Sequence, residues 1–293
     1  MKALFLVNAR SGVKRRHNLA DIIRHTCAQW SYDIVACERK EDLEQIVDRA
    51  EADNVDVLYA VGGDGTVHET AKRLIGRRVA LGVVPTGSGN GFARHIGLPM
   101  DLRASILACR GERIVTIDTA RVNDAAFLGT MGVGFDAVVA HAFANAGTRG
   151  FRTYLRVGLR EFRNFAAEEY EIEVDGERIT RRAFVVAVAN SAHYGNNARI
   201  APLASLQDGL LDIVVVDDVS LFRALMLLPP LLRGTFHRVR GVTVLRGHHI
   251  EIRRAAEGPA HLDGEPVVLG ASLVVDIVPS SLRVLVADKA GAI

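Results

Sequence analysis

Residues 55–66 read Val-Asp-Val-Leu-Tyr-Ala-Val-Gly-Gly-Asp-Gly-Thr, an apolar run rich in β-branched residues that ends in a glycine-rich turn. A second run of this kind, Val79–Val84, precedes the turn Pro85-Thr86-Gly87-Ser88-Gly89-Asn90-Gly91. Nearly unbroken apolar runs of this length are typical of strands buried on both faces of a parallel sheet. Each turn leads into a segment with helical spacing, so the pattern predicts repeated strand–helix units.

The preceding residues continue this alternation toward the N-terminus. Strands are predicted at Ala3–Val7 and Asp33–Ala36, and helices at about Asn18–Trp30 and Asp42–Ala52. The β-α-β-α order predicts a parallel sheet covered by helices. Ligands of such sheets bind at the carboxyl ends of the strands, which is where the glycine-rich turns lie.

The pattern changes after about Thr119, where short strands separated by turn residues become the dominant signal. This spacing is typical of an antiparallel sandwich or barrel. Two helical segments interrupt it, at about Arg149–Phe165 and at Leu221–Phe236, where Pro229-Pro230 is expected to break the helix. The predicted strands are Phe127–Met131, Tyr170–Val174, Ala183–Ala189, Leu211–Val216, Val242–Leu245, His249–Arg253 and Ser272–Val278.

The sequence therefore predicts an α/β domain over residues 1–118 and an antiparallel β-sandwich or β-barrel domain over residues 119–279. A last apolar segment, Leu282–Ala287, has the pattern of a strand that could return to the first domain, although spacing alone does not place it.

Composition limits the class of protein. The 293 residues are 49% hydrophobic and 24% charged, and 36 basic residues against 34 acidic ones leave a net charge of +2. These values exclude a disordered chain and argue against a highly basic nucleic-acid binder. The three cysteines form no C-x-x-C pair, and no apolar run approaches the ~18–20 residues that span a bilayer. We therefore expect a cytoplasmic protein in a reducing compartment, with no nucleic-acid partner.

Three turns at predicted strand ends have the residues of a phosphate site. Asn8-Ala9-Arg10-Ser11-Gly12 follows the first strand, and the turns at Gly62 and Pro85 follow the third and fourth. Glycines let the backbone approach a ligand, and N–H groups that open a helix attract anions. Asp64 would repel phosphates unless a cation such as Mg²⁺ lay between them. The simpler alternative is that these glycines only make tight turns. The chain has no Gly-Lys pair for a Walker A loop, and no G-x-G-x-x-G follows the first strand.

Three further motifs follow along the chain: Gly132-Val133-Gly134-Phe135-Asp136-Ala137, Asp208-Gly209-Leu210-Leu211-Asp212 and Asp263-Gly264-Glu265. Together with Gly62-Gly63-Asp64-Gly65-Thr66 they resemble the diacylglycerol kinase catalytic-domain family, which includes bacterial lipid kinases and relatives of sphingosine and ceramide kinases. The Gly-Gly-Asp-Gly-Thr turn alone also resembles NAD kinases and phosphofructokinases. The resemblance implies a nucleotide domain, a sandwich domain, an active site in the cleft between them, and a C-terminal tail, residues 280–293, that returns to the first domain.

The resemblance also implies roles for individual residues. Glu265 matches the proton acceptor for the lipid hydroxyl, and Asp64 lies near the phosphates and metal. Asp118 matches an acidic position that supports the metal. Ser205, Asp208 and the Leu210 carbonyl match a second, structural Mg²⁺ site. The positions that match ATP contacts are Asn8, Ser11, Gly12, Gly62, Gly63, Asp64, Gly65, Thr66, Val67, His68, Gly87, Ser88 and Asn90. From the residues alone, the Asp263 and Asp208 segments could also be ordinary polar turns.

The leading hypothesis is an ATP- and Mg²⁺-dependent lipid kinase that acts on a diacylglycerol-type substrate. A soluble NAD kinase-like enzyme is one alternative. A non-catalytic nucleotide- or lipid-binding regulator is another, because Gly91 replaces an acidic residue that the family often has at this point. A homodimer is left open.

A lipid substrate would require peripheral association with a membrane. Arginines at 149, 152, 156, 160 and 163 form a stripe at helical spacing, and Leu155 and Leu159 lie on another face. The segment Leu221–Phe236 adds apolar residues and is followed by further basic ones. A basic amphipathic helix suits an anionic membrane surface. The alternative is that both apolar faces are core and the arginines form an ordinary solvated face.

Overall fold

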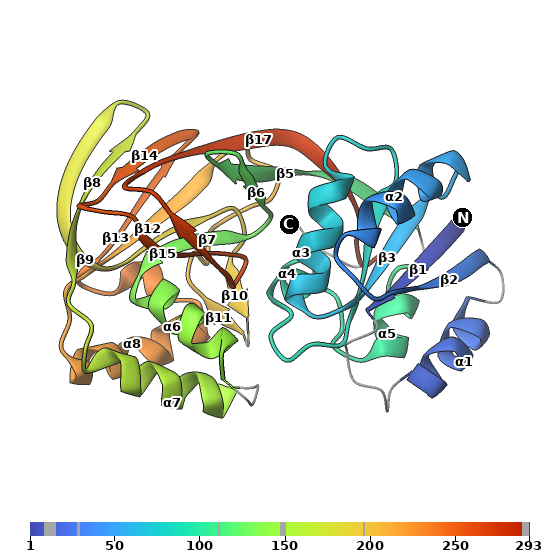
Figure 1. The fold of residues 1–293 in the computed structure, drawn as a ribbon, viewed down its shortest axis with the longest axis horizontal. Helices are drawn as coiled ribbons and strands as arrows, with labels where there is room; N and C mark the ends of the chain where they lie inside the picture. The colour runs from blue at the N-terminus through green and yellow to red at the C-terminus, as the bar shows by residue number, and fades with distance from the viewer. Residues whose placement is uncertain (9–15, 28–29, 111, 147–150, 196, 289–292) are drawn as a thin grey trace. The chain divides into compact units, whose positions relative to one another are not determined.

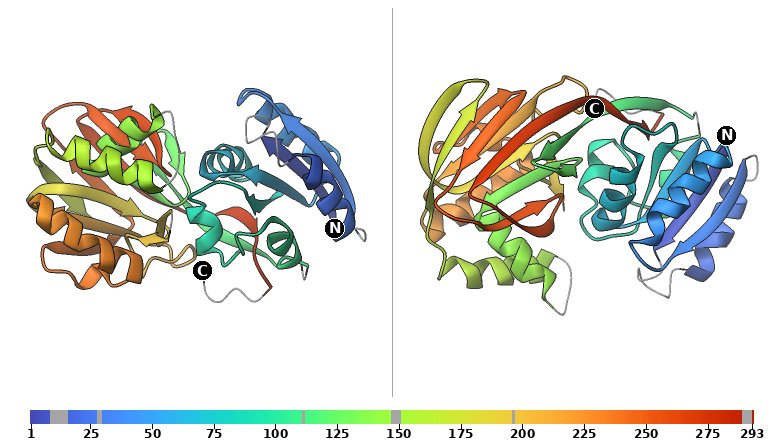
Figure 2. Two further views of the ribbon diagram at one scale, coloured as in Figure 1. Left: turned by 90° about the horizontal axis from the view of Figure 1, so that it is seen from below. Right: turned by 45° about the horizontal axis from the view of Figure 1, so that its top comes forward.

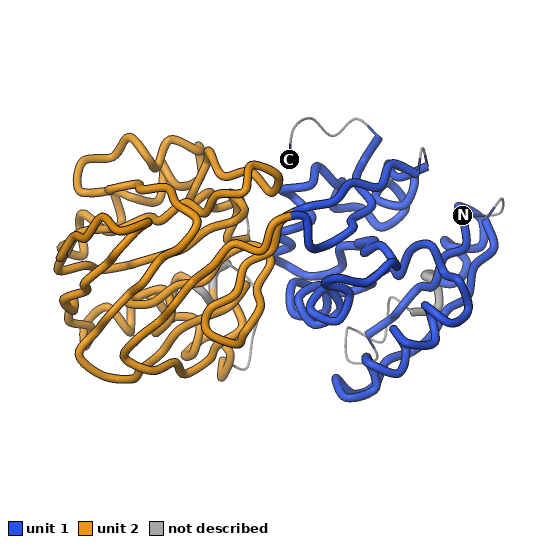
Figure 3. Tube along the Cα trace, turned by 90° about the horizontal axis from the view of Figure 1, so that it is seen from above, with its two compact units in different colours: residues 1–117, 280–293 blue, residues 118–279 orange. Residues whose placement is uncertain are grey.

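The computed structural model describes the chain except for residues 9–15, 28–29, 111, 147–150, 196 and 289–292. It divides into two compact units (Figure 3). Unit 1 comprises residues 1–117 and 280–293, and unit 2 comprises residues 118–279. In the described part of the chain, no helix combines the length and apolar character needed to cross a bilayer.

Unit 1 is built on a parallel sheet in the order β4-β3-β1-β2. β3 and β4 are buried at every position, which explains their unbroken apolar sequences. The ring of Tyr59 on β3 stacks on Phe5 of β1 with centroids 4.5 Å apart, and the rings of Phe5 and Tyr32 on β2 meet edge to face. The strands are β1 Lys2–Asn8, β2 Ser31–Cys37, β3 Val57–Gly62 and β4 Ala80–Pro85.

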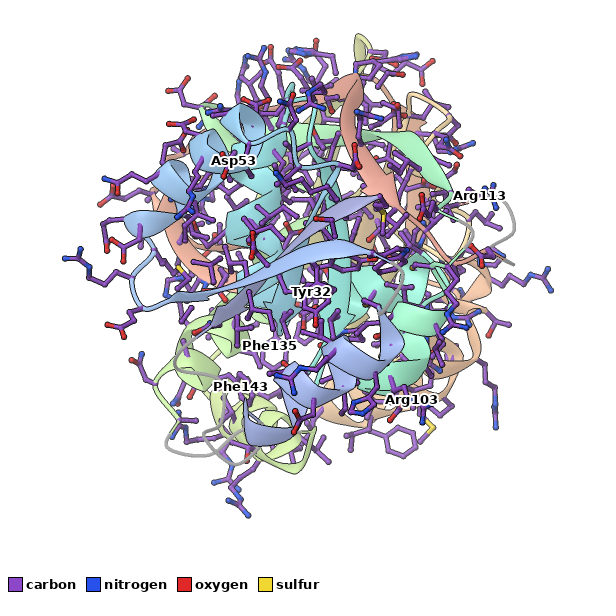
Figure 4. The ribbon with its side chains drawn as sticks, turned by 90° about the vertical axis from the view of Figure 1, so that its right-hand side faces the viewer. Tyr32, Asp53, Arg103, Arg113, Phe135 and Phe143 are labelled. Atoms are coloured by element: carbon purple, nitrogen blue, oxygen red, sulfur yellow. The ribbon has the colours of Figure 1, made fainter. Side chains whose placement is uncertain are left out.

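Helices cover both faces of this sheet. α2 packs with α3, and α1 packs with α5. Figure 4 shows that α2 and α1 lie on opposite sides of the strands. α3 and α4 begin directly at the two glycine-rich turns that follow β3 and β4. The helices are α1 Arg16–Thr26, α2 Asp42–Ala52, α3 Asp64–Leu74, α4 Gly91–His95 and α5 Leu102–Leu107.

Unit 2 is an antiparallel β-structure, as the sequence predicts. Its strands pair in the order β16-β15-β7-β9-β8-β14-β17, and β12 lies against both β9 and β13. One face carries a core of buried aliphatic and aromatic side chains that includes Phe127, Tyr170 and Ile213. The strands are β5 Ile114–Val122, β6 Ala125–Phe127, β7 Thr130–Gly134, β8 Glu168–Val174, β9 Glu177–Ala189, β10 His193–Gly195, β11 Ala198–Arg199, β12 Leu211–Asp217, β13 Val242–Gly247, β14 His249–Arg253, β15 Gly258–Leu262, β16 Glu265–Leu269 and β17 Ser272–Leu285.

Three helices lie together on one side of unit 2 (Figures 1 and 2): α6 Phe135–Ala144, α7 Phe151–Phe162 and α8 Leu221–Arg233. They pack on the sheet through a second core, in which Phe184 of β9 stacks on Phe135 with centroids 4.5 Å apart. A short 3-10 helix, Phe236–Arg238, follows α8.

Two local expectations are corrected. The segment Ser272–Val278 and the first four residues of Leu282–Ala287 belong to one long strand, β17, which ends at Leu285. It pairs with β14 and then lies parallel to β4 at Val284. α8 runs through Pro229 and Pro230 without a break. The carbonyls that lose their N–H partners belong to Leu225 and Met226, both of which are exposed, so water can replace the missing donors.

Candidate active site

The two glycine-rich turns of unit 1 pack directly against each other. A Cβ at Gly62 would lie 2.3 Å from the hydroxyl oxygen of Thr66. A Cβ at Gly87 would lie 2.6 Å from the Cα of Gly63 and 2.8 Å from Oδ1 of Asn90. A side chain at Gly87 would force the two turns apart, and one at Gly62 would displace Thr66 within its own turn, which explains both glycines.

Asp64 joins the two turns. Its Oδ2 accepts the backbone N–H of Asn90 and its Oδ1 accepts that of Gly91, each at 2.7 Å. Asn90 has a φ of +53°, and its side chain both accepts from the Gly87 N–H at 3.2 Å and donates to the Gly87 carbonyl at 2.8 Å. The carboxylate of Asp64 therefore has a structural role in addition to any role toward phosphate or metal.

The other nucleotide positions predicted in unit 1 differ in accessibility. Asn8 lies at the end of β1 and donates from Nδ2 to Thr66 Oγ1 at 2.9 Å, which brings the first turn to the second. Ser88 is exposed, whereas Val67 and His68 are buried in α3 at 5% and 4% exposure. The side chains of Val67 and His68 thus belong to the core. Ser11 and Gly12 lie outside the described residues.

Glu69, in the first half of α3, is tied to basic groups. Burial alone raises the pKa of its carboxyl, but hydrogen bonds from Arg73 at 2.8 Å and Lys40 at 3.2 Å outweigh this effect and lower the pKa to about 2. This carboxylate is ionised and engaged, so it is a poor candidate for a general base.

In unit 2, the turn Asp263-Gly264-Glu265 connects β15 to β16. Asp263 and Gly264 have φ values of +52° and +83°. The carboxylate of Asp263 accepts three backbone N–H groups, from Leu128 at 2.9 Å, Gly129 at 2.7 Å and Thr130 at 2.9 Å. Asp263 therefore anchors the turn to the segment that leads into β7.

Glu265 is in a different environment from Asp263. It is the first residue of β16, opposite Leu262, and is half-buried. Its carboxylate makes no hydrogen bond or ion pair with any residue that the structure describes. One carboxylate of the turn is thus structural, and the other is available to a ligand.

Asn190 connects the acidic turn to Asp118. It is fully buried, and its Nδ2 donates to the carbonyls of Asp118 at 2.9 Å and Leu128 at 2.7 Å. The Asp118 carboxylate is itself 4% exposed and accepts the Gly209 N–H at 2.9 Å. A continuous set of hydrogen bonds therefore runs through Asp118, the segment before β7 and the acidic turn.

Comparisons with known proteins agree with both units. Residues 2–122 match the family model described as the diacylglycerol kinase catalytic domain. Residues 129–286 match the one described as the YegS C-terminal NAD kinase beta sandwich-like domain. A Klebsiella pneumoniae protein named "Probable lipid kinase YegS-like" is 30% identical over 83% of this chain and 82% of its own length. The chain belongs to the YegS-like family of lipid kinases.

Solved structures share the fold of this lipid kinase. A diacylglycerol kinase from Bacillus anthracis has a TM-score of 0.77 at 19% identity, with 99% of this chain and 98% of that chain covered. An NAD kinase from Archaeoglobus fulgidus, solved in complex with ATP, has a TM-score of 0.53 at 13% identity over 99% of this chain and 95% of that chain. The family predicted from the motifs, the fold class and the enzyme class are thus confirmed.

The second metal site predicted for this lipid kinase has an unexpected neighbour. The guanidinium of Arg246 forms an ion pair with Asp208 and lies 3.4 Å from Oδ1 of Asp212. Burial raises the pKa of Asp212 to about 6, although the charge of Arg246 opposes this shift. Among the described residues, no three His, Cys, Asp or Glu side chains form a group that could hold a metal ion. The metal role of Ser205, Asp208 and Leu210 stays a prediction, and here Arg246 supplies the positive charge beside Asp208.

Sequence reasoning about this kinase missed the roles of Asn190, Asp263 and Arg246. Asn190 and Asp263 lie in motif segments, but nothing in their spacing shows that both bind the segment at 128–130. Arg246 lies in an ordinary strand pattern, and only its pairing opposite Asp212 reveals its contact. No local signal identifies such partners.

Proposed function

We propose that this chain is an ATP-dependent kinase that transfers the γ-phosphate to the hydroxyl of a lipid, with diacylglycerol as the first candidate substrate. The carboxylate of Glu265 is the observation that carries this proposal: it has no described partner and sits on a turn that Asp263 anchors. A carboxylate held in this way can accept a proton from an attacking hydroxyl. Asp118 supports the same region through Asn190.

The nucleotide is proposed to bind the turns of unit 1. Glycines let a phosphate approach the backbone of these turns closely, and Ser88 presents an exposed hydroxyl. The fold neighbour from A. fulgidus was solved with ATP, which supports ATP as the donor. Mg²⁺ fits the donor chemistry of Asp64, because a carboxylate oxygen that accepts one N–H can also bind a cation. Bound there with the phosphates, the ion would neutralise their charge.

Gly87→Ala tests the nucleotide site. The new methyl group would meet the Cα of Gly63 at 2.6 Å, so the two turns must move apart. Overpacking of this kind costs about 1–3 kcal/mol, and we expect the affinity for ATP to fall by about tenfold or more. Isothermal titration with ATP and Mg²⁺ measures the change. Gly270→Ala, where a Cβ has no neighbour within 4 Å, is the control and should bind as the wild type does. Wild-type affinity in Gly87→Ala would exclude these turns as the phosphate site.

A soluble NAD kinase-like activity is the second candidate, because an NAD kinase shares the fold. Incubation with γ-labelled ATP and either diacylglycerol vesicles or NAD distinguishes the two. If the chain is a lipid kinase, label should appear in the lipid phase alone. Label in NADP would instead show that the chain is an NAD kinase. ATP binding without transfer to any lipid or to NAD would instead support a non-catalytic regulator.

We also propose that α8 contacts the membrane that holds the substrate. Phe222 and Met226 are 72% and 54% exposed, whereas Leu227 faces the core. The charged residues from 221 to 241 are all basic, and they are Arg223, Arg233, Arg238 and Arg240. An apolar surface flanked by arginines suits an anionic bilayer, because each basic residue near it contributes about 1 kcal/mol.

α7 extends this surface in part. Leu155 and Leu159 are 37% and 40% exposed, and Arg156 and Arg160 are exposed as well. The predicted apolar face of α7 is therefore only partly buried. This differs from the alternative that the apolar faces of both helical segments belong to the core. Arg149 lies outside the described residues.

Replacing Phe222 and Met226 together by glutamate is expected to lower binding to anionic vesicles by about tenfold or more, because two apolar contacts are lost and two negative charges are added. Flotation with vesicles that contain phosphatidylglycerol measures this. Ile34→Glu, at a 42% exposed apolar residue of β2, is the matched control. Equal flotation of all three proteins would refute the role of α8.

A further inference from the structure

Next to the turn Asp263-Gly264-Glu265 lies a cluster of three polar side chains from three different elements, two of them buried and one partly buried. Asp136 is the second residue of α6, Tyr194 lies on β10, and His261 lies on β15. Asp136 and His261 are 7% and 4% exposed. Oδ2 of Asp136 accepts the Tyr194 hydroxyl at 2.7 Å and lies 3.1 Å from Nε2 of His261. The rings of Tyr194 and His261 meet edge to face with centroids 5.5 Å apart.

The backbone of unit 2 is shaped around this cluster. A Cβ at Gly132 would lie 2.2 Å from Oδ2 of Asp136 and 2.5 Å from Nε2 of His261. Gly134 precedes α6 with a φ of +98°, and a Cβ there would lie 2.6 Å from the carbonyl oxygen of Phe184. The two glycines therefore give Asp136 the space and the backbone direction that it needs to meet His261.

The hydrogen bonds determine which nitrogen of His261 carries the proton. The backbone N–H of Gly264 points at Nδ1 at 3.4 Å, so Nδ1 must be the acceptor. Nε2 then carries the hydrogen and donates it to Asp136. In this tautomer the neutral ring satisfies both neighbours. With the proton on Nδ1 instead, two N–H groups would face each other at Gly264.

We propose that Asp136, His261 and Tyr194 are positioning residues that orient Glu265 by fixing the tautomer of His261 and, through it, the backbone of Gly264. Asp263 anchors the turn through its hydrogen bonds to residues 128–130, and His261 accepts the backbone N–H of the next residue, Gly264. Glu265 follows directly. The inference rests on the proposed role of Glu265 for its effect on turnover, but the tautomer itself is independent of that role.

The isosteric change Asp136→Asn tests the proposal without creating a cavity. Oδ1 of Asp136 accepts the backbone N–H of Ala137 at 2.8 Å, which orients the oxygen of the new amide toward α6. The amide NH₂ then faces His261 and requires Nε2 to become an acceptor. The proton moves to Nδ1, as a carboxylate-to-amide exchange behind a histidine imposes the wrong tautomer in other enzymes. The hydrogen bond from Gly264 is lost.

Two measurements on the full chain detect the effect of Asp136→Asn. ¹⁵N NMR of histidine-labelled protein should show His261 protonated on Nε2 in the wild type and on Nδ1 in Asp136→Asn, with the signal assigned by its loss in His261→Gln. We expect kcat for lipid phosphorylation in Asp136→Asn to fall by about 10²-fold, the cost of misplacing a reacting group by ~1 Å. The KM for ATP should stay within about twofold, because the positioned group contacts the acceptor and not the nucleotide.

Controls separate positioning from folding. Asp124→Asn makes the same chemical change at an exposed position and should leave kcat and the His261 signal unchanged. His261→Gln keeps one donor and one acceptor and should recover most of the kcat that His261→Leu loses. Wild-type His261 protonated on Nδ1, or Asp136→Asn with wild-type kcat, would overturn the proposal. If the wild type phosphorylates no lipid, the proposed function fails, and the NMR result still decides the tautomer.

Discussion

Glu265→Gln is expected to reduce lipid phosphorylation by a factor on the order of 10²–10⁴, because the amide cannot accept the proton of the attacking hydroxyl. The loss should appear in kcat, while ATP affinity stays at the wild-type value. Glu265 makes no described hydrogen bond or ion pair, so the exchange removes no contact that stabilises the fold. Transfer of label from γ-labelled ATP to diacylglycerol, together with a thermal melt of each protein, measures both effects.

Glu257→Gln provides the comparison for this variant. Glu257 is an exposed glutamate of the same unit, just before β15, and its exchange should leave turnover and melting temperature unchanged. Full turnover in Glu265→Gln would exclude Glu265 as the general base, whereas a lowered melting temperature would assign Glu265 a structural role.

Asp64→Asn is expected to have two separable effects, because the carboxylate also accepts N–H groups from Asn90 and Gly91. The amide keeps one acceptor oxygen and turns its NH₂ toward the other N–H. Hydrogen bonds to a charged group contribute about 1.5–3 kcal/mol each. We therefore expect the free energy of unfolding of Asp64→Asn to be lower than that of the wild type by roughly 2 kcal/mol. Turnover should fall by about 10²-fold or more, because the proposed nucleotide site would lose the negative charge that faces Mg²⁺.

Titrations with ATP in Mg²⁺ and in EDTA separate the two effects of Asp64. A structural role alone predicts equally weakened ATP binding in both buffers. A metal role predicts that Mg²⁺ strengthens ATP binding to the wild type but has little effect on Asp64→Asn. Wild-type stability together with wild-type turnover in Asp64→Asn would contradict both roles.

The fold of unit 1 follows directly from its sequence, since β3 and β4 are nearly continuous apolar runs and a glycine-rich turn follows each of them. α6 was not expected. Its segment, Phe135–Ala144, is a short and nearly continuous apolar run, and periodicity does not distinguish a helix from a buried strand in such a run. The prolines of α8 were also misleading, because a helix with an exposed face tolerates missing N–H donors there.

The candidate site was predictable only where the chemistry is local. The motifs predicted Asp64 and Glu265 as candidates, but not that Asp263 accepts backbone N–H groups while Glu265, in the same turn, has no described partner. That difference arises from three backbone N–H groups that lie 133–135 residues away in the chain. The cluster of Asp136, Tyr194 and His261 depends equally on strand pairing, which brings Gly132 opposite His261. Residues that act through tertiary contacts leave no pattern in the sequence near them.

Above all, we propose that this chain moves a phosphate from ATP to a lipid hydroxyl. Incubating the purified protein with a whole-cell lipid extract, Mg²⁺ and ATP labelled with ¹⁸O in the γ-phosphate tests it most directly. Mass spectrometry should find one class of lipid that gains a labelled phosphate with the wild type and gains at most about a hundredth as much with Glu265→Gln. An extract in which no lipid gains the label, although the protein binds ATP, would show that the chain is not a kinase of these lipids.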